Sequence, residues 1–300
     1  MVAAVIVLYN PDMSLLDRLL RSVVGQVQSA FVVDNTPGSF VAFSSHFEKY
    51  QGIVSYVPLG ENKGIATAQN VGIRESLSAG HSHVLLLDQD STLPPGMVTK
   101  LLEAETALIQ SGEKVAAVGP LIVEVKNGKR YGAVRHGWFH TSRISIDPST
   151  DKPVATDYLN ASGSLIRTEV FEQVGLMLDE LFIDAVDTEW CLRSRNKGFY
   201  SYVVPSAIMA HGLGDTVVHV LGRDIILHND IRNYYMVRNH TYLLRMMSMG
   251  WKWRLFNLVY IPKYIVVHSW LSGHTYKSLK LLLSALLNGL IGNVGRIAEK

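Results

Sequence analysis

His83-Val-Leu-Leu-Leu-Asp-Gln-Asp-Ser91 is the stretch of this 300-residue chain that decides its fold. Four aliphatic residues in a row lead directly into two carboxylates, Asp88 and Asp90. Such an apolar run is typical of a strand that is buried on both faces of a parallel sheet. The carboxylates then follow the carboxyl end of the strand, where open α/β sheets bind ligands and where hard oxygen atoms suit Mg²⁺ or Mn²⁺ on a diphosphate. A solvated turn in which Asp90 caps the next helix is the alternative.

The segments around this stretch alternate between strand and helix patterns. We expect strands at residues 2–8, 30–33, 53–57, 83–87 and 115–118, a strand at 159–166, a helix at 186–197, a strand at 199–204 and a loop at 205–214. This alternation predicts an α/β fold with a mostly parallel, Rossmann-like sheet and helices on both faces. We expect a nucleotide-binding and catalytic domain over residues 1–225 and a helical region over residues 226–300.

Composition narrows the class of protein. Hydrophobic residues make up 48% and charged residues 18% of the chain, which indicates a folded globular protein. The net charge of +2 gives no reason to expect a nucleic-acid partner. The single cysteine, Cys191, excludes an intrachain disulfide framework and fits a reducing, cytoplasmic compartment.

The last sixty residues are basic and rich in aromatic and aliphatic side chains. Residues 241–300 hold eight Lys or Arg residues, one acidic residue and three tryptophans. No stretch of 18 residues there reads as a membrane-spanning helix. Basic amphipathic helices with tryptophan are typical of binding to a membrane surface, so we expect a peripheral protein on the cytoplasmic face of the inner membrane. A helical hairpin that covers the core or forms a homodimer is the alternative.

Polar residues end the first two strands. Tyr9 and Asn10 follow the first strand, and Asp34 ends the second, so all three are expected near the switch point of the sheet. Tyr9 could stack on a base, and Asp34 could accept the imide N–H of uracil or thymine. An Asx-turn is the alternative role of Asp34.

Lys63 and Gly64 open a helix that is rich in small residues. Lys63 could reach a phosphate, and the amino-terminal end of the helix favours anions. The chain has neither Gly-x-Gly-x-x-Gly nor Gly-Lys-Ser/Thr at this position, which excludes the usual dinucleotide and P-loop motifs. An ordinary packed helix with a basic first residue is the alternative.

Three acidic residues, Asp184, Asp187 and Glu189, lie around the start of another helix. An ionised carboxylate that faces a sugar hydroxyl can act as a general base. The alternative is a structural role, with helix capping and a pair between Glu189 and Arg193.

Further candidates follow in the last third of the chain. His211 could join carboxylates on a metal, or could simply be solvated. Arg232 and Arg238 carry guanidinium groups, which bind diphosphate well.

The order and spacing of these motifs resemble glycosyltransferase family 2, the inverting enzymes of GT-A fold. The resemblance rests on Leu8-Tyr9-Asn10, Asp34-Asn35, Asn62-Lys63-Gly64 with Asn70-Val71-Gly72, Asp88-Gln89-Asp90, and Asp187 before Trp190-Cys191-Leu192-Arg193, and it covers about residues 2–240. The segment from Phe182 to Arg193, together with Arg232-Asn-Tyr-Tyr and Arg238-Asn239, resembles bacterial rhamnosyltransferases of O-antigen and lipopolysaccharide core assembly.

The resemblance implies a role for each position. Tyr9, Asn10 and Asp34 would hold the base and ribose, and Lys63 and Gly64 would line the nucleotide pocket. Asp88, Gln89 and Asp90 would bind ribose and the metal diphosphate, with Asp90 as the more direct ligand of Mg²⁺ or Mn²⁺ and His211 completing the metal site. Arg232 and Arg238 would also contact the nucleotide sugar. Asp187 would be the catalytic base, and Asp184, Glu189 and Trp190 would contact the acceptor. Many members of the family have Glu-Asp at the base, whereas here Val186 precedes Asp187.

The implied reaction moves L-rhamnose from dTDP-β-L-rhamnose to a saccharide or lipid-linked saccharide acceptor of a cell-surface polysaccharide. A UDP-hexose or UDP-N-acetylhexosamine donor is the first alternative, because Asp34 would bind uracil and thymine equally. A membrane-peripheral nucleotide-binding protein without transferase activity is an alternative of another class.

Overall fold

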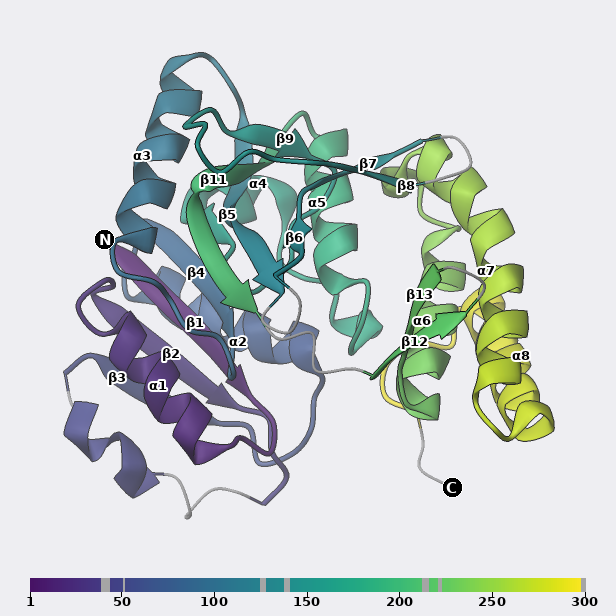
Figure 1. Ribbon diagram of the computed structural model, residues 1–300. Helices are drawn as coiled ribbons and strands as arrows, with labels where there is room; N and C mark the ends of the chain where they lie inside the picture. Colours follow the sequence, from purple (N-terminus) through teal and green to yellow (C-terminus); the bar gives the residue numbers. More distant parts are fainter. Residues whose placement is uncertain are drawn as a thin grey trace.

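A nine-stranded mixed sheet forms the centre of the part of the chain that the structure describes (Figure 1). The structure is a computed structural model and describes residues 1–38, 44–50, 52–124, 128–137, 141–211, 216–220 and 223–297. The strand order is β3-β2-β1-β4-β10-β5-β11-β9, and β6 pairs with β5. The sheet consists of β1 (Val2–Leu8), β2 (Ser29–Asp34), β3 (Val54–Pro58), β4 (His83–Asp88), β5 (Val115–Glu124), β6 (Arg130–Tyr131), β9 (Val154–Thr156), β10 (Leu165–Arg167) and β11 (Tyr200–His211).

Helices cover both faces of this sheet, as the sequence predicts. Two hairpins stand apart from it, β7 (Ala133–His136) with β8 (Thr141–Ile144), and β12 (Thr216–Val220) with β13 (Arg223–Leu227). The helices around the sheet are α1 (Met13–Val23), α2 (Ile65–Ser78), α3 (Met97–Gln110), α4 (Thr168–Val174) and α5 (Val186–Asn196), with 3-10 turns η1 (Ser44–Tyr50) and η2 (Asp179–Leu181). One core cluster joins residues of α1 and α3 to one face of β1 and β4, and a second joins residues of α2, α4 and α5 to the opposite face.

The parallel strands β2, β1 and β4 bring three chain segments to one edge. Leu8 of β1 lies opposite Asp34 of β2, and Val7 of β1 lies opposite Asp88 of β4. Residues of one strand alternate between the two core clusters, with Ile6 and Leu8 on one face and Val5 on the other. Both faces are therefore apolar, which is why these strands read as continuous hydrophobic runs.

Two expected segments differ from the structure. The strand expected at residues 159–166 is only three residues long, β10, and it runs antiparallel between β4 and β5. The loop expected at residues 205–214 is wrong for residues 205–211, because β11 continues to His211, and residues 212–214 lie outside the described residues. The register of β11 against β5 shifts between Val204 and Ile208, and this irregularity accommodates Pro205, which lacks an N–H donor.

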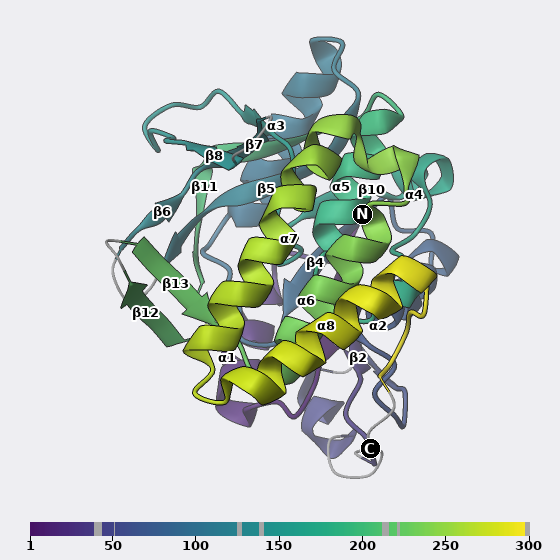
Figure 2. The ribbon, with the colours of Figure 1, turned by 90° about the vertical axis from the view of Figure 1, so that its right-hand side faces the viewer.

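The C-terminal helices form a separate layer beside the sheet, which Figure 2 shows face on. This layer contains α6 (Asp230–Leu243), η3 (Met247–Met249), α7 (Trp251–Leu271) and α8 (Thr275–Ile291). Helix α8 packs tightly on α6, because a Cβ atom on Gly289 would lie 2.5 Å from the carbonyl oxygen of Arg238. Within the described residues, no helix has the length and apolar character needed to cross a membrane. The domain boundary expected between residues 225 and 226 falls inside β13 and stays a prediction.

Candidate active site

The ends of β1 and β4 are joined through the side chain of Gln89. Its Oε1 atom accepts a hydrogen bond from the N–H of Tyr9 at 2.8 Å, and its Nε2 donates to the carbonyl of Tyr9 at 3.2 Å. The ring of Tyr9 remains exposed. Asn10 has a positive φ of 47°, and its N–H donates to Thr36 Oγ1 at 2.8 Å. Tyr9, Asn10 and Gln89 thus lie together at the edge where the sequence predicts nucleotide binding.

Asp34 lies at the same edge but is fully buried. One carboxylate oxygen accepts the N–H of Thr36 at 2.9 Å, and the other accepts the hydroxyl of Tyr56 at 2.6 Å. The Asx-turn considered as an alternative is therefore present. Because each carboxylate oxygen can accept more than one hydrogen bond, contact with a base stays a prediction.

A network of asparagine side chains fixes the loop that carries Lys63. Asn35 donates to Asn62 Oδ1 at 3.0 Å and accepts the N–H of Lys63 at 2.7 Å. Asn62 Oδ1 also accepts the N–H of Gly64 at 3.0 Å. The ammonium of Lys63 is 3.5 Å from Glu61 and is partly exposed. The end of β2 and the start of α2 are thereby held in one arrangement.

Gly64 allows the turn before α5 to approach α2. It has a φ of 85°, and a Cβ atom there would lie 2.6 Å from the carbonyl oxygen of Phe182. That same oxygen accepts the N–H of Ile65 at 2.7 Å. Only glycine satisfies both the positive φ and the close contact.

The carboxylates of Asp88, Asp184 and Asp187 interact electrostatically. The pKa of Asp187 is raised to about 6, chiefly by burial and also by the negative charges of Asp88 and Asp184, while hydrogen bonds from backbone N–H groups oppose the shift. Asp187 accepts the N–H of Thr188 at 2.7 Å at the start of α5. Asp184 pairs with Arg232, with 3.1 Å between Oδ1 and Nε. The structure therefore brings four predicted site residues to one place.

Asn239 of α6, the residue after Arg238, holds the turn that carries Asp184. The amide nitrogen of Asn239 donates to the carbonyls of Leu181 (2.9 Å), Ile183 (2.7 Å) and Asp184 (2.9 Å). Phe182, Asp184 and Ala185 all have positive φ angles near 60–65°. The sequence motif contained Asn239 beside Arg238, but nothing in it indicated this role.

Ser162 is a second residue that sequence reasoning missed. Its hydroxyl accepts the N–H of Asp88 at 3.2 Å and also contacts the hydroxyl of Ser91. It lies in the segment expected to be a strand, where no local pattern indicates a contact with Asp88. Ser162 links the turn before β10 to the carboxyl end of β4.

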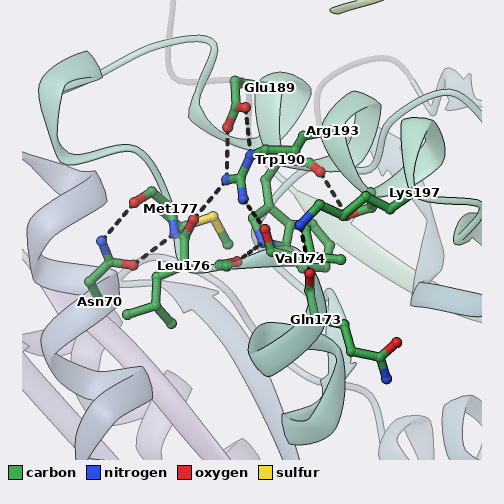
Figure 3. Close-up of polar contacts among 11 residues, drawn as sticks. Asn70, Gln173, Val174, Leu176, Met177, Glu189, Trp190, Arg193 and Lys197 are labelled. Carbon is green, nitrogen blue, oxygen red and sulfur yellow. Dashed lines mark hydrogen bonds and ion pairs between the residues drawn. The ribbon is translucent and has the colours of Figure 1, made fainter. Parts of the chain in front are cut away.

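Three predicted site residues are not brought to this edge. Arg238 is fully buried and donates to the carbonyls of Glu180, Leu181 and Gly295, so it is not placed to bind a diphosphate. Glu189 is fully buried and both of its oxygens bind Arg193, at 2.7 and 3.0 Å (Figure 3). Trp190 is buried and donates to the carbonyl of Gly175 at 2.9 Å.

Glu189 is therefore paired with Arg193, as the structural alternative in the sequence analysis expects. Arg193 also donates to the carbonyls of Val174 and Leu176, and Asn70 binds both the N–H and the carbonyl of Met177 (Figure 3). These contacts fix the connection between α4 and η2. Two quoted motif residues, Asn70 and Arg193, thus support the scaffold around the site.

The metal candidates are only partly described. Asp90 is exposed directly after β4. The backbone of His211 pairs with Glu124 at the end of β11, but its side chain lies outside the described residues. In the described part of the chain, no group of three or more His, Cys, Asp or Glu side chains is placed to hold a metal ion. The charges of Asp88 and Asp184, which raise the pKa of Asp187, would suit a cation that keeps water and diphosphate oxygens as its other ligands.

A mixed sheet of this order, with carboxylates at its carboxyl edge, has the GT-A fold. Solved structures with TM-scores of 0.60 and 0.57 share it: GalNAc-T7 with UDP, GalNAc and Mn²⁺ (16% identity, 89% of this chain), and the mannosyltransferase PcManGT from Pyrobaculum calidifontis with GDP-Man and Mn²⁺ (15%, 97% of this chain and 75% of that one). This chain spans 55% of the GalNAc-T7 chain.

The family model "Glycosyl transferase family 2" matches residues 3–175, and the chain belongs to this family. It is 36% identical over 244 residues to the dTDP-rhamnosyl transferase RfbF of Shigella flexneri. The matched region covers 81% of this chain and 79% of the relative. The expected fold and family are thus confirmed.

Proposed function

We propose that this glycosyltransferase moves L-rhamnose from dTDP-β-L-rhamnose to a hydroxyl group of a glycan acceptor, with inversion at the anomeric carbon. Membership of family 2 supports sugar transfer, and the 36% identity to a dTDP-rhamnosyl transferase supports the donor. The acceptor belongs to a bacterial cell-surface polysaccharide or lipopolysaccharide.

The observation that carries the proposal is the position of Asp187. Its partly buried carboxylate begins α5 and interacts with Asp88, which ends β4. Asp187 takes the proton of the acceptor hydroxyl while that oxygen attacks the anomeric carbon. The bond from this carbon to the diphosphate breaks on the opposite face and its electron pair leaves with dTDP, so a β-linked donor gives an α-linked product.

The donor would bind along the ends of β1, β2 and β4. In this proposal Tyr9, Asn10 and Asp34 hold the base and ribose, and Lys63, Gly64, Asp88, Gln89 and Arg232 surround the rest of the nucleotide sugar. Arg238, Glu189 and Trp190 are left out because they are buried in the scaffold. Asp184 is retained as the acceptor contact because its charge acts on Asp187.

Asp88 and Asp90 would hold Mg²⁺ or Mn²⁺. A bound divalent cation would supply positive charge to the diphosphate leaving group. The mutual repulsion of the carboxylates at this edge supports a cation there.

Asp187→Asn tests the catalytic role. The amide cannot accept the acceptor proton, so kcat should fall by about 10²- to 10⁴-fold while the donor KM changes little. The assay is dTDP release from dTDP-β-L-rhamnose with a rhamnose-accepting glycan and Mg²⁺. Asp179→Asn is the matched control, because Asp179 binds Thr67 and Asn70 and lies outside the proposed catalytic group. Near-normal turnover of Asp187→Asn would contradict the assignment, and turnover of UDP-sugars instead would contradict the donor.

We also propose that α7 and α8 rest on an anionic membrane surface and bring the enzyme to a lipid-linked acceptor. Large apolar side chains are exposed along both helices: Leu258, Val259, Val266, Trp270, Tyr276, Leu283, Leu287, Leu290 and Ile291. Lys263, Lys277 and Lys280 are exposed among them. Exposed apolar residues interspersed with cations match the chemistry of an interface with anionic lipids.

Val266→Glu combined with Leu287→Glu tests this contact. Both residues are exposed, so the fold should be retained, whereas binding to phosphatidylglycerol vesicles should fall at least tenfold in a flotation assay. Ile144→Glu, at an exposed apolar position on β8, should bind as the parent does. If the double variant floats normally but changes from dimer to monomer in light scattering, the face is instead an interface between two copies.

A further inference from the structure

A pocket of about 430 Å³ lies away from the proposed active site, between β7, the last turn of α5 and the first turn of α7. Its size falls in the range of small-molecule sites. Arg195, which lines it, is eight residues beyond Asp187 on α5, or about 12 Å along the helix axis. No step of the proposed transfer uses this pocket.

Two guanidinium groups share one carboxylate at the wall of this pocket. Arg135 and Arg195 each donate to Oδ1 of Asp157, which is buried and also accepts the N–H of His136 at 2.6 Å. The side chains of the two arginines remain 39% and 43% exposed. One carboxylate neutralises only one of them, and each guanidinium keeps further N–H donors. The wall therefore presents a net positive charge with forked donors.

The opposite wall adds positive charge and an aromatic surface. Lys252 lines the pocket, and so do the exposed ring of Trp251 and the buried ring of Trp253. All three residues belong to the first turn of α7, whose N-cap, Gly250, provides no side-chain hydrogen bond. The dipole at this amino-terminal end of the helix favours an anion there. Asp157 is the single acidic residue that lines the pocket among those described.

We propose that this pocket binds a phosphate ester, with its phosphate between Arg135, Arg195 and Lys252 and its organic part against Trp251. Arginine forks and helix amino termini both recognise phosphate oxygens, whereas a neutral sugar would gain nothing from the charge. The phosphate can belong to a lipid headgroup or to a soluble phosphate compound. The inference is independent of the proposed transfer reaction.

Titration with inorganic pyrophosphate in EDTA tests the site. EDTA removes the divalent cation that the donor site would require, and Trp251 and Trp253 report binding by fluorescence. We expect a saturable change that weakens as salt rises. The doubly substituted Arg195→Gln Lys252→Gln protein should bind at least tenfold more weakly, and Lys252→Gln alone should weaken binding without a risk to folding because Lys252 is exposed.

Two matched controls separate this pocket from other cationic surfaces. Lys280→Gln removes an exposed positive charge from α8, and Lys63→Gln removes one from the proposed donor site. Both proteins should bind pyrophosphate with the affinity of the parent. If no saturable change occurs, or if Lys252→Gln and the double variant bind as the parent does, the proposal is wrong.

Vesicle flotation identifies the source of the phosphate. If the double variant also loses affinity for phosphatidylglycerol vesicles and pyrophosphate displaces the parent from them, the ligand is a lipid headgroup. If vesicle binding is unchanged while pyrophosphate binding is lost, the ligand is a soluble phosphate ester.

Discussion

Four residues other than glycine have a positive φ within the described chain, and all four lie beside the candidate active site. They are Asn10, Phe182, Asp184 and Ala185. Each such conformation costs about 1–2 kcal/mol for an L-residue. A hydrogen bond from the N–H of Asn10 to Thr36 Oγ1 holds Asn10, and hydrogen bonds from the side chain of Asn239 hold the 181–184 turn, in these conformations. The positions of Asp184 and Asp187 therefore depend on the contacts around them.

Gly64→Ala should destabilise the enzyme and impair turnover. The new Cβ atom would lie 2.6 Å from Phe182 and would force that turn away, in addition to the strain of a positive φ. Gly60→Ala is the matched control, because Gly60 has a φ of 74° but nothing within 4 Å of the added atom.

Urea denaturation separates the two effects of these substitutions. We expect a loss of about 1–2 kcal/mol for Gly60→Ala from backbone strain alone. Gly64→Ala should lose more than that and should also lose kcat at least tenfold. Equal losses in both variants would show that the contact with Phe182 does not matter.

Single residues could be predicted from sequence only where a strand end fixed their position. Asp88 and Asp34 follow or end apolar runs, so their place at the sheet edge could be deduced. Arg238 and Glu189 carry charges that suggest ligand binding. The carbonyl partners of Arg238 lie on other segments, so its burial leaves no mark on the local pattern. Glu189 pairs with Arg193 of the same helix, which is the alternative that the local spacing offered.

At the scale of elements, α6 connects the C-terminal layer to the active site. Asn239 binds three carbonyls of the turn before α5. Arg238 binds the carbonyl of Glu180, which precedes this turn, and the carbonyl of Gly295, which follows α8. Arg232 of the same helix pairs with Asp184. The helix therefore positions the acidic turn as well as packing against α7 and α8.

Asn239→Ala should loosen this turn. Three buried carbonyls would lose a donor, which should lower the free energy of unfolding by about 2–4 kcal/mol. Because Asp184 moves with the turn, kcat should fall at least tenfold as well. Asn293→Ala, which removes an exposed contact with Asn288, should leave both quantities nearly unchanged. Full activity of Asn239→Ala would show that the turn does not need this helix.

The elements that could be predicted are those with a long, local pattern. The apolar runs of β1, β2 and β4 and the helix expected at residues 186–197, which is α5, led to bounds within a few residues. Strand β10 has three residues and no measurable period, and its place between β4 and β5 depends on distant pairing. Strand β11 continues through Pro205, where the sequence predicted the start of a loop.

At the scale of the whole molecule, the helical layer contains a buried histidine that makes stability depend on pH. Burial lowers the pKa of His268 to about 4, and the ring stacks on Tyr264 with 3.8 Å between centroids. Above pH 6.5 the side chain is neutral in both the folded and the unfolded chain. Between pH 6.5 and 4 the unfolded chain binds a proton that the folded protein does not bind.

The free energy of unfolding should therefore fall by up to about 3 kcal/mol from this group as the pH drops from 6.5 to 4. Urea denaturation at pH 7.5 and at pH 5 measures the loss, and His268→Gln should reduce the difference. His274→Gln, at an exposed position of the same layer, should leave it unchanged. An equal pH dependence in His268→Gln would contradict this origin.

The antiparallel insertion of β10 has a consequence for synthesis of the chain on the ribosome. Strands β1 to β4 can pair as soon as residue 88 has emerged, but the free edge of β4 receives β10 only after residue 167. At 5–20 residues per second, that edge stays open for about 4–16 s. An apolar strand with unpaired backbone groups is prone to associate with other chains. We therefore expect nascent chains that stall between these two positions to need a chaperone.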